Sequence, residues 1–152
     1  MSIPFTGQLE ARRDAPLHLQ LQLTPQATKT SASGCEDVLI EGRAVRIFRG
    51  ETLINMGDAV SFRILSCPKA DGPPTGPAYV YREDLATATH AEVFLYGTPP
   101  NCRLADYEIA LLQGPSVEPR LTLAQLELLL VEWNASARSP SRPKRWWHLL
   151  GR

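Results

Sequence analysis

The chain has 152 residues, of which 43% are hydrophobic and 21% are charged, and these ordinary values exclude a wholly disordered chain. Thirteen prolines and ten glycines leave little room for an all-helical bundle, and no apolar run is long enough to span a membrane as a helix. Residues 1–137 hold 11 basic and 16 acidic residues, a net charge of −5, whereas residues 138–152 hold five basic residues and no acid. The negative body disfavours non-specific nucleic-acid binding, and the +5 tail favours an acidic surface, the nearest of which is the body itself.

The clearest strand covers residues 17–24, where four leucines alternate with polar residues. A period of two predicts a half-buried antiparallel strand with one wet face, on which His18 points to water. Residues 5–13 are expected to form its hairpin partner. Residues 26–36 are small and polar and indicate a loop.

A long strand is expected from about Val38 to Arg49, followed by two turns and a strand at residues 60–64. Its apolar residues change phase just after Gly42. A bulge or bend at Gly42 would turn both phases toward the core. Residues 67–77 contain four prolines and two glycines and indicate a loop.

Two short strands are expected at Ala78 to Arg82 and at Glu92 to Gly97, with Glu92 facing outward. A helical turn or two is expected between them. Residues 103–113 fit both a strand and a helical stripe, and we favour the strand because Ala105, Tyr107, Ile109 and Leu111 alternate.

The strongest helix signal covers residues 122–134. Thr122 and Gln125 form a capping box, and leucines recur at helical spacing behind them. We expect this helix to be mostly buried and to plug the mouth or the open side of the sheet. The fold class is therefore mainly β, a small antiparallel β-barrel or bent sandwich, with an OB-like barrel as one form, plus one C-terminal helix and a basic tail. Residues 1–134 make a single β-rich domain, and residues 135–152 make a Pro/Ser/Arg-rich linker and a basic-aromatic tail.

Three cysteines, an odd number without metal-ligand spacing, predict free thiols and no bound metal. The first residues show no secretory leader, so we expect a cytoplasmic protein. Arginine outnumbers lysine 13 to 3, which hints at a bacterial source.

Catalytic motifs are absent from the sequence. It has no Gly-x-Ser-x-Gly elbow, no Walker A motif and no dinucleotide fingerprint, and its three histidines are scattered. Cys102 and His90 could form a nucleophile and base, but a small buried cysteine is the better interpretation. We therefore assign no catalytic residue, no metal ligand and no cofactor.

Aromatic residues give the strongest binding signal. If the strands at 78–82 and 92–97 pair, one exposed stripe would hold Tyr79, Tyr81, Phe94 and Tyr96, with arginines to contact phosphates at positions 43, 46, 49, 63 and 82. The alternative is that the tyrosines pack over a sheet edge with their hydroxyls outward. In the tail, the binding candidates are Arg145, Trp146 and Trp147, which would strap onto the body or dock on a partner.

The leading functional hypothesis is a non-enzymatic, soluble β-domain that acts in binding or assembly, with a second copy or another protein as its partner. The alternative is an OB-like single-stranded nucleic-acid-binding protein. An enzyme of unidentified class comes third.

Overall fold

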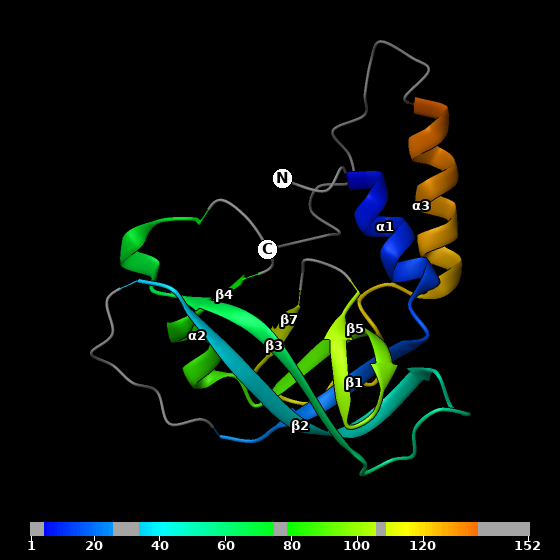
Figure 1. Cartoon of the computed structure of the whole chain (residues 1–152). Coiled ribbons are helices and arrows are strands. Elements are labelled where there is room, and N and C mark those ends of the chain that lie inside the picture. Colours follow the sequence, from blue (N-terminus) through cyan, green and yellow to red (C-terminus); the bar gives the residue numbers. More distant parts are fainter. Residues whose placement is uncertain (1–4, 26–33, 75–78, 106–108, 137–152) are drawn as a thin grey trace.

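The structure is a computed structural model that describes residues 5–25, 34–74, 79–105 and 109–136 (Figure 1). It is mainly β, with a closed five-stranded barrel, further strands outside the barrel and a C-terminal helix, which confirms the predicted fold class. In chain order the elements are α1 (Phe5–Asp14), β1 (Leu17–Leu23), β2 (Glu36–Arg49), β3 (Ala59–Cys67), a 3₁₀ turn (Lys69–Asp71), β4 (Tyr79–Tyr81), α2 (Arg82–Thr87), β5 (His90–Thr98), β6 (Asn101–Leu104), β7 (Ala110–Leu112) and α3 (Leu123–Ser136).

The barrel closes in the order β1-β2-β3-β6-β5, because β5 pairs back onto β1. Its neighbouring strands are antiparallel except at the junction of β3 and β6, where Ser61 lies opposite Asn101 in a parallel pair. Five is also the number of strands in the barrels of OB folds. Outside the ring, β4 pairs with β3 and β7 pairs with β5.

The barrel interior is filled by the inward side chains of every barrel strand, because alternate residues of a strand point to one face. The predicted leucine phase of β1 is confirmed: Leu17, Leu19 and Leu21 are fully buried. Phe62 of β3 is the largest side chain among the fully buried residues. Together these side chains belong to one apolar core cluster, whose remaining buried residues are Ile40, Ala44, Ile54, Val60, Ile64, Val80, Ala91, Val93, Leu95 and Cys102.

The predicted bend at Gly42 is wrong. β2 pairs with β3 over residues 36–43 and with β1 over residues 42–49, and both ladders pass through Gly42 without a break. The register shifts lie further along, where β1 skips Val45 and Phe48, and Ile47 between these two residues packs against the barrel core. Gly42 serves close packing instead, since an added Cβ would lie 2.6 Å from the carbonyl oxygen of Gln22.

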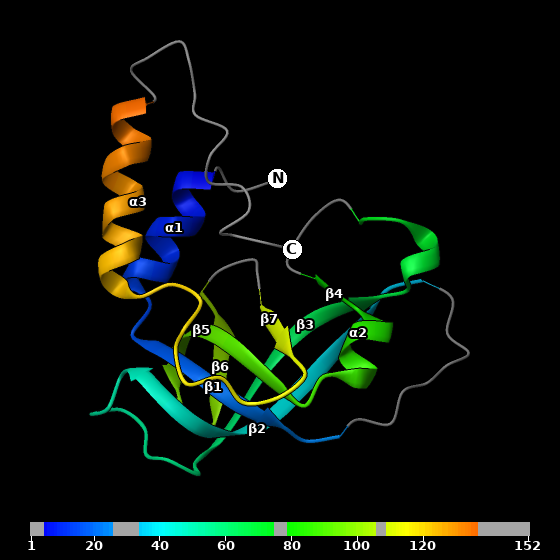
Figure 2. The same ribbon diagram turned by 180° about the vertical axis from the view of Figure 1, so that it is seen from behind.

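The N-terminal segment is a helix, so the expectation of a hairpin strand at residues 5–13 is wrong. α1 and α3 lie side by side next to the barrel (Figures 1 and 2). Between them is a second, smaller apolar cluster, which consists of Leu9, Ala15, Phe94, Leu121, Leu126, Leu129 and Leu130. Phe94 of β5 is the barrel's contribution, because it points outward from the barrel into this cluster.

The C-terminal helix begins as predicted. The Thr122 amide donates to Gln125 Oε1 at 2.8 Å, and the Gln125 amide donates to Thr122 Oγ1 at 3.2 Å, which completes a capping box. The expectation that α3 is mostly buried and plugs the barrel is wrong, because it packs against α1 and leaves Leu128 and Val131 exposed. Only one face of the helix is buried, whereas the sequence predicted that most of the helix would be.

The shorter segments agree with the sequence in outline. α2 supplies the expected helical turn before β5. Of residues 103–113, β6 and β7 take up parts as strands, and residues 106–108 lie outside the described residues. The predicted loops at 26–36 and 67–77 are described only in part, because residues 26–33 and 75–78 also lie outside them.

Candidate functional site

The four strand aromatics do not gather into one stripe. In the described sheet β4 pairs with β3, whereas Phe94 and Tyr96 belong to β5. Tyr79 and Tyr81 contact each other edge to face, with ring centroids 5.4 Å apart. Phe94 is buried beside the helices, and Tyr96 is 36% exposed on the outer surface of the barrel. The pairing on which the predicted stripe depended is therefore not formed.

The outer side of β1 and β5 carries a buried histidine–glutamate pair. His18 and Glu92 are only 2% and 4% exposed, and His18 Nε2 lies 2.7 Å from Glu92 Oε1. Both point outward from the barrel, on the neighbouring strands β1 and β5. The His18 ring stacks on Phe94 at 4.0 Å and contacts Phe48 at 4.9 Å. The expectation that His18 points to water is therefore wrong, whereas Glu92 faces outward from the barrel as expected but is buried. Both are buried because later parts of the chain cover this wall.

The covering segment is held by hydrogen bonds from its backbone. The Arg120 amide donates to both carboxylate oxygens of Glu92, at 3.2 and 3.1 Å. Gln20 bonds the backbone of Ser116 twice: its Nε2 donates to the carbonyl oxygen at 3.0 Å, and its Oε1 accepts from the amide at 3.1 Å. We call His18, Gln20, Glu92 and these two backbone positions the buried polar cluster. It attaches residues 114–121 across β1 and β5.

Burial lowers the pKa of His18, and the hydrogen bond to Glu92 opposes that shift without reversing it. A neutral imidazole with its proton on Nε2 can donate to Glu92 Oε1, so this form satisfies the pair. The charged form would instead require a cation in a buried position near Arg12 and Arg49, which also lower the pKa of His18. Because neither His18 nor Glu92 reaches the surface, the pair can position backbone but cannot meet a substrate.

Two of the arginines expected to contact a ligand are used inside the fold. Arg49 Nη1 donates to the carbonyl oxygens of Arg12, Arg13 and Ala15, at 2.8, 2.9 and 2.8 Å. These carbonyls lie at the C-terminal end of α1, where helix carbonyls lack helical partners. Arg82 Nη2 donates to the carbonyl oxygen of Gly34 at 2.9 Å. The other three candidates are on β2 and β3.

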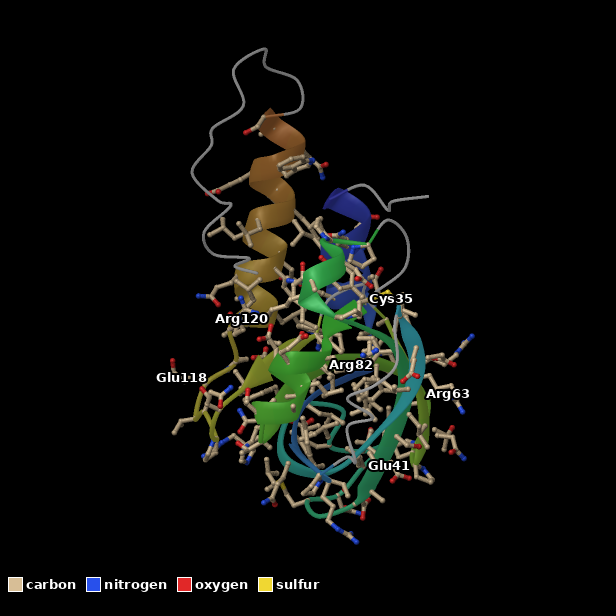
Figure 3. The ribbon with its side chains drawn as sticks, turned by 90° about the vertical axis from the view of Figure 1, so that its left-hand side faces the viewer. Cys35, Glu41, Arg63, Arg82, Glu118 and Arg120 are labelled. Atoms are coloured by element: carbon tan, nitrogen blue, oxygen red, sulfur yellow. A yellow bond between two sulfur atoms is a disulfide. The ribbon has the colours of Figure 1, made fainter. Side chains whose placement is uncertain are left out.

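The opposite wall of the barrel is open. We define the open barrel face as the outward side chains of β2, β3 and β6 together with Tyr96, which comprise Asp37, Leu39, Glu41, Arg43, Ser61, Arg63, Asn101, Arg103 and Tyr96. Arg63 bonds Asp37 at 3.1 Å, with both side chains more than 60% exposed. Arg103 lies opposite Tyr96 in the β5–β6 ladder. Figure 3 shows Arg63 projecting from one side of the molecule and Glu118 from the other.

The Cys102 and His90 pair is not assembled. Cys102 lies opposite Gly97 at the hairpin end of β5, and His90 is at the other end of the same strand. His90 Nδ1 lies 2.8 Å from Thr89 Oγ1. Burial raises the pKa of the Cys102 thiol, which disfavours a thiolate nucleophile. Within the described ranges, no group of three potential ligands is placed to hold a metal ion.

The prediction of three free thiols is wrong, because Cys35 and Cys67 form a disulfide. The register of β2 and β3 explains the pairing. Glu36 lies opposite Ser66, so Cys35, one residue before Glu36, lies opposite Cys67, one residue after Ser66. The bridge joins the start of β2 to the end of β3. It removes the cysteine argument for a reducing compartment, and the cytoplasmic location stays a prediction.

The tail candidates Arg145, Trp146 and Trp147 lie outside the described residues. Among the helices of the described segments, none is long and apolar enough to cross a membrane.

No protein-family model, no curated protein and no solved structure shows a significant match to the chain. The fold alone defines the class, which is a small closed β-barrel with an appended helix pair.

The sequence analysis missed the buried polar cluster. The polar residues that alternate with leucines in β1 gave no sign that another segment would cover them.

Proposed function

We propose that this protein is a non-enzymatic binding domain that assembles with a second copy of itself through the open barrel face. The observation that carries the proposal is the contrast between the two walls of the barrel. The wall of β1 and β5 is sealed by residues 114–121 and the helix pair. On the wall of β2 and β3, Asp37 and Arg63 are both more than 60% exposed, and Leu39 is 42% exposed.

The charges of the open barrel face favour a protein ligand over a polyanion. Acidic and basic residues alternate with an apolar one along β2, where Asp37, Leu39, Glu41 and Arg43 share the outward side. A groove for a nucleic-acid backbone needs one sign of charge, because its affinity comes from neutralised phosphates. A face with both signs can instead complement itself across a twofold axis, since each residue i that meets j is matched by j meeting i.

Sedimentation velocity over a range of protein concentrations tests the proposal. Wild-type protein should show a concentration-dependent dimer, and Leu39→Asp should weaken it by placing a desolvated acid in the contact. Val117→Asp is the matched control, because Val117 is 74% exposed outside the face. A wild-type protein that stays monomeric at all concentrations would overturn the proposal, as would equal weakening by both variants.

Single-stranded nucleic acid is the second candidate, favoured by one specific feature. Tyr96 and Arg103 face each other on the outer side of β5 and β6, and OB folds bind oligonucleotides on the barrel surface and adjoining loops. A stacking ring beside a cation is the combination that such ligands use. Fluorescence anisotropy with a labelled oligothymidine tests it: binding should weaken with added salt and be lost in Tyr96→Ala. The Tyr79→Ala variant serves as the control, because Tyr79 lies on β4, outside the face.

A further inference from the structure

The outward side of α3 carries an apolar stripe. Ala124, Leu128, Val131 and Ala135 follow one another at spacings of four, three and four residues, so they lie along one side of the helix. Leu128 is 57% exposed and Val131 is 66% exposed, whereas Leu126, Leu129 and Leu130 face the second apolar cluster. We call these four residues the α3 stripe. It is separate from the open barrel face.

Acidic side chains flank the α3 stripe. Glu127 precedes Leu128 and Glu132 follows Val131. The Oε2 atom of Glu132 is buried and has no hydrogen-bond partner among the described residues. A buried carboxylate oxygen without a donor is costly, so a cation beside Glu132 would offset part of this cost. A segment that is both apolar and positively charged would therefore complement the α3 stripe.

We propose that residues 144–150 of the same chain fold back and dock on the α3 stripe. The segment begins eight residues after the end of α3, and it combines four large apolar residues with two adjacent cations, Lys144 and Arg145. The apolar members are Trp146, Trp147, Leu149 and Leu150. No acid occurs between residues 138 and 152, so the charge of the segment complements Glu127 and Glu132.

The connecting chain is long enough. The seven residues from 137 to 143 can span about 23–25 Å when extended. The axial distance from Ser136 back to Leu128 is about 12 Å, since an α-helix rises 1.5 Å per residue. The connection can therefore turn around the end of α3 and bring the two tryptophans level with Leu128 and Val131.

The area of the α3 stripe fits a short peptide better than a second copy of the chain. Two large side chains about half exposed, flanked by two alanines, offer on the order of a few hundred Å² of apolar surface. A stable protein interface needs about 800 Å² from each partner. Two tryptophans bury about 150–250 Å² each, which matches the smaller figure. The tail of the same chain also pays no cost of bringing two molecules together.

The test uses the full-length chain with Leu128→Gln and Val131→Gln. In a Trp133→Phe background, fluorescence comes only from Trp146 and Trp147, and acrylamide quenching reports their exposure. Removing this apolar contact should lower the docking equilibrium about tenfold, equivalent to about 1.4 kcal/mol, and raise the quenching constant accordingly. Val117→Gln is the control, because it replaces an equally exposed valine outside α3.

Tryptic cleavage after Lys144 and Arg145 gives a second measure with Trp133 intact. The two α3 variants should be cleaved faster than the wild type and the Val117 control. Equal quenching and equal cleavage in all variants would overturn the proposal. A dimer in sedimentation velocity that the α3 variants abolish and Leu39→Asp leaves unchanged would also overturn it, because a second copy would then cover the stripe.

Discussion

The two faces of β1 are both buried, but by different kinds of contact. Inside the barrel, Leu17, Leu19 and Leu21 pack against apolar side chains from the other strands, and such contacts need no direction. On the outer wall, His18 and Gln20 are equally buried, but each is satisfied by defined hydrogen-bond partners from residues 92–120. One strand thus faces two cores, one nonpolar and one polar.

The difference determines which changes each core can tolerate. An apolar core loses stability in proportion to the volume removed, and neighbouring side chains can partly fill the gap. A polar core loses a fixed partner, and the groups left behind remain buried without one. We therefore expect size to govern substitutions inside the barrel and hydrogen-bonding capacity to govern those on the outer wall.

The largest effect should come from the barrel interior. Phe62→Ala removes the largest fully buried side chain, and it should lower the free energy of unfolding by about 3–5 kcal/mol. Urea denaturation measures the loss, with Leu53→Ala as the control, because Leu53 is 53% exposed and should change stability by less than about 0.5 kcal/mol. A loss at Phe62 no larger than that at Leu53 would mean that the barrel is not the main core.

Reduction of the disulfide should have the next effect. Breaking the Cys35–Cys67 bond frees the ends of β2 and β3, and native disulfides of this kind contribute about 2–4 kcal/mol. Alkylation of the unfolded, unreduced chain should label Cys102 alone. Three labelled thiols in protein purified without reductant would contradict the bridge.

Removing the carboxylate of the buried polar cluster comes third. Glu92→Ala leaves His18 Nε2 and the Arg120 amide without their acceptor, and hydrogen bonds to a charged group contribute about 1.5–3 kcal/mol. Glu41→Ala is the control, since Glu41 is exposed on β2. If both variants lose the same small amount, the outer wall does not depend on its polar contacts.

Close packing at the seam between the strands gives a prediction of similar size. Gly42→Val would place its Cβ against the Gln22 carbonyl oxygen, and such overpacking costs about 1–3 kcal/mol. The Gly114→Ala control meets nothing within 4 Å and should leave the melting temperature unchanged. A Gly42→Val protein as stable as the control would show that β1 and β2 separate easily here.

The smallest effect should be a pH dependence of the free energy of unfolding, which arises from His18 on the outer wall. The pKa of His18 is lowered by burial from its ordinary value of 6.5, so below about pH 6.5 the unfolded chain binds a proton that folded His18 does not. Stability from this residue is therefore full above pH 6.5 and is lost as the pH falls toward the lowered pKa. Urea titrations above and below that pH should show the decline, and His18→Gln should flatten it. An unchanged slope in His18→Gln would locate the dependence elsewhere.

The elements that the sequence predicted correctly are those whose signals are local. Leucine alternation predicted β1, the Thr122–Gln125 capping box predicted the start of α3, and turn residues separated the strands well enough to indicate a small barrel. These features depend on neighbours within a few residues, so their physics is contained in short windows of sequence.

Which segment covers each surface depends on contacts between distant parts of the chain. Arg49 completes the end of α1 from 34 to 37 residues away, and α1 packs against α3, so a helix forms where a hairpin strand was expected. His18 is buried because it contacts Glu92, Phe94 and Phe48. Cys35 lies opposite Cys67 because β2 and β3 pair in one register. Burial and strand pairing depend on contacts between distant segments. An alternating pattern of polar and apolar residues is the same whether its polar face contacts water or another part of the chain, so the pattern does not distinguish the two.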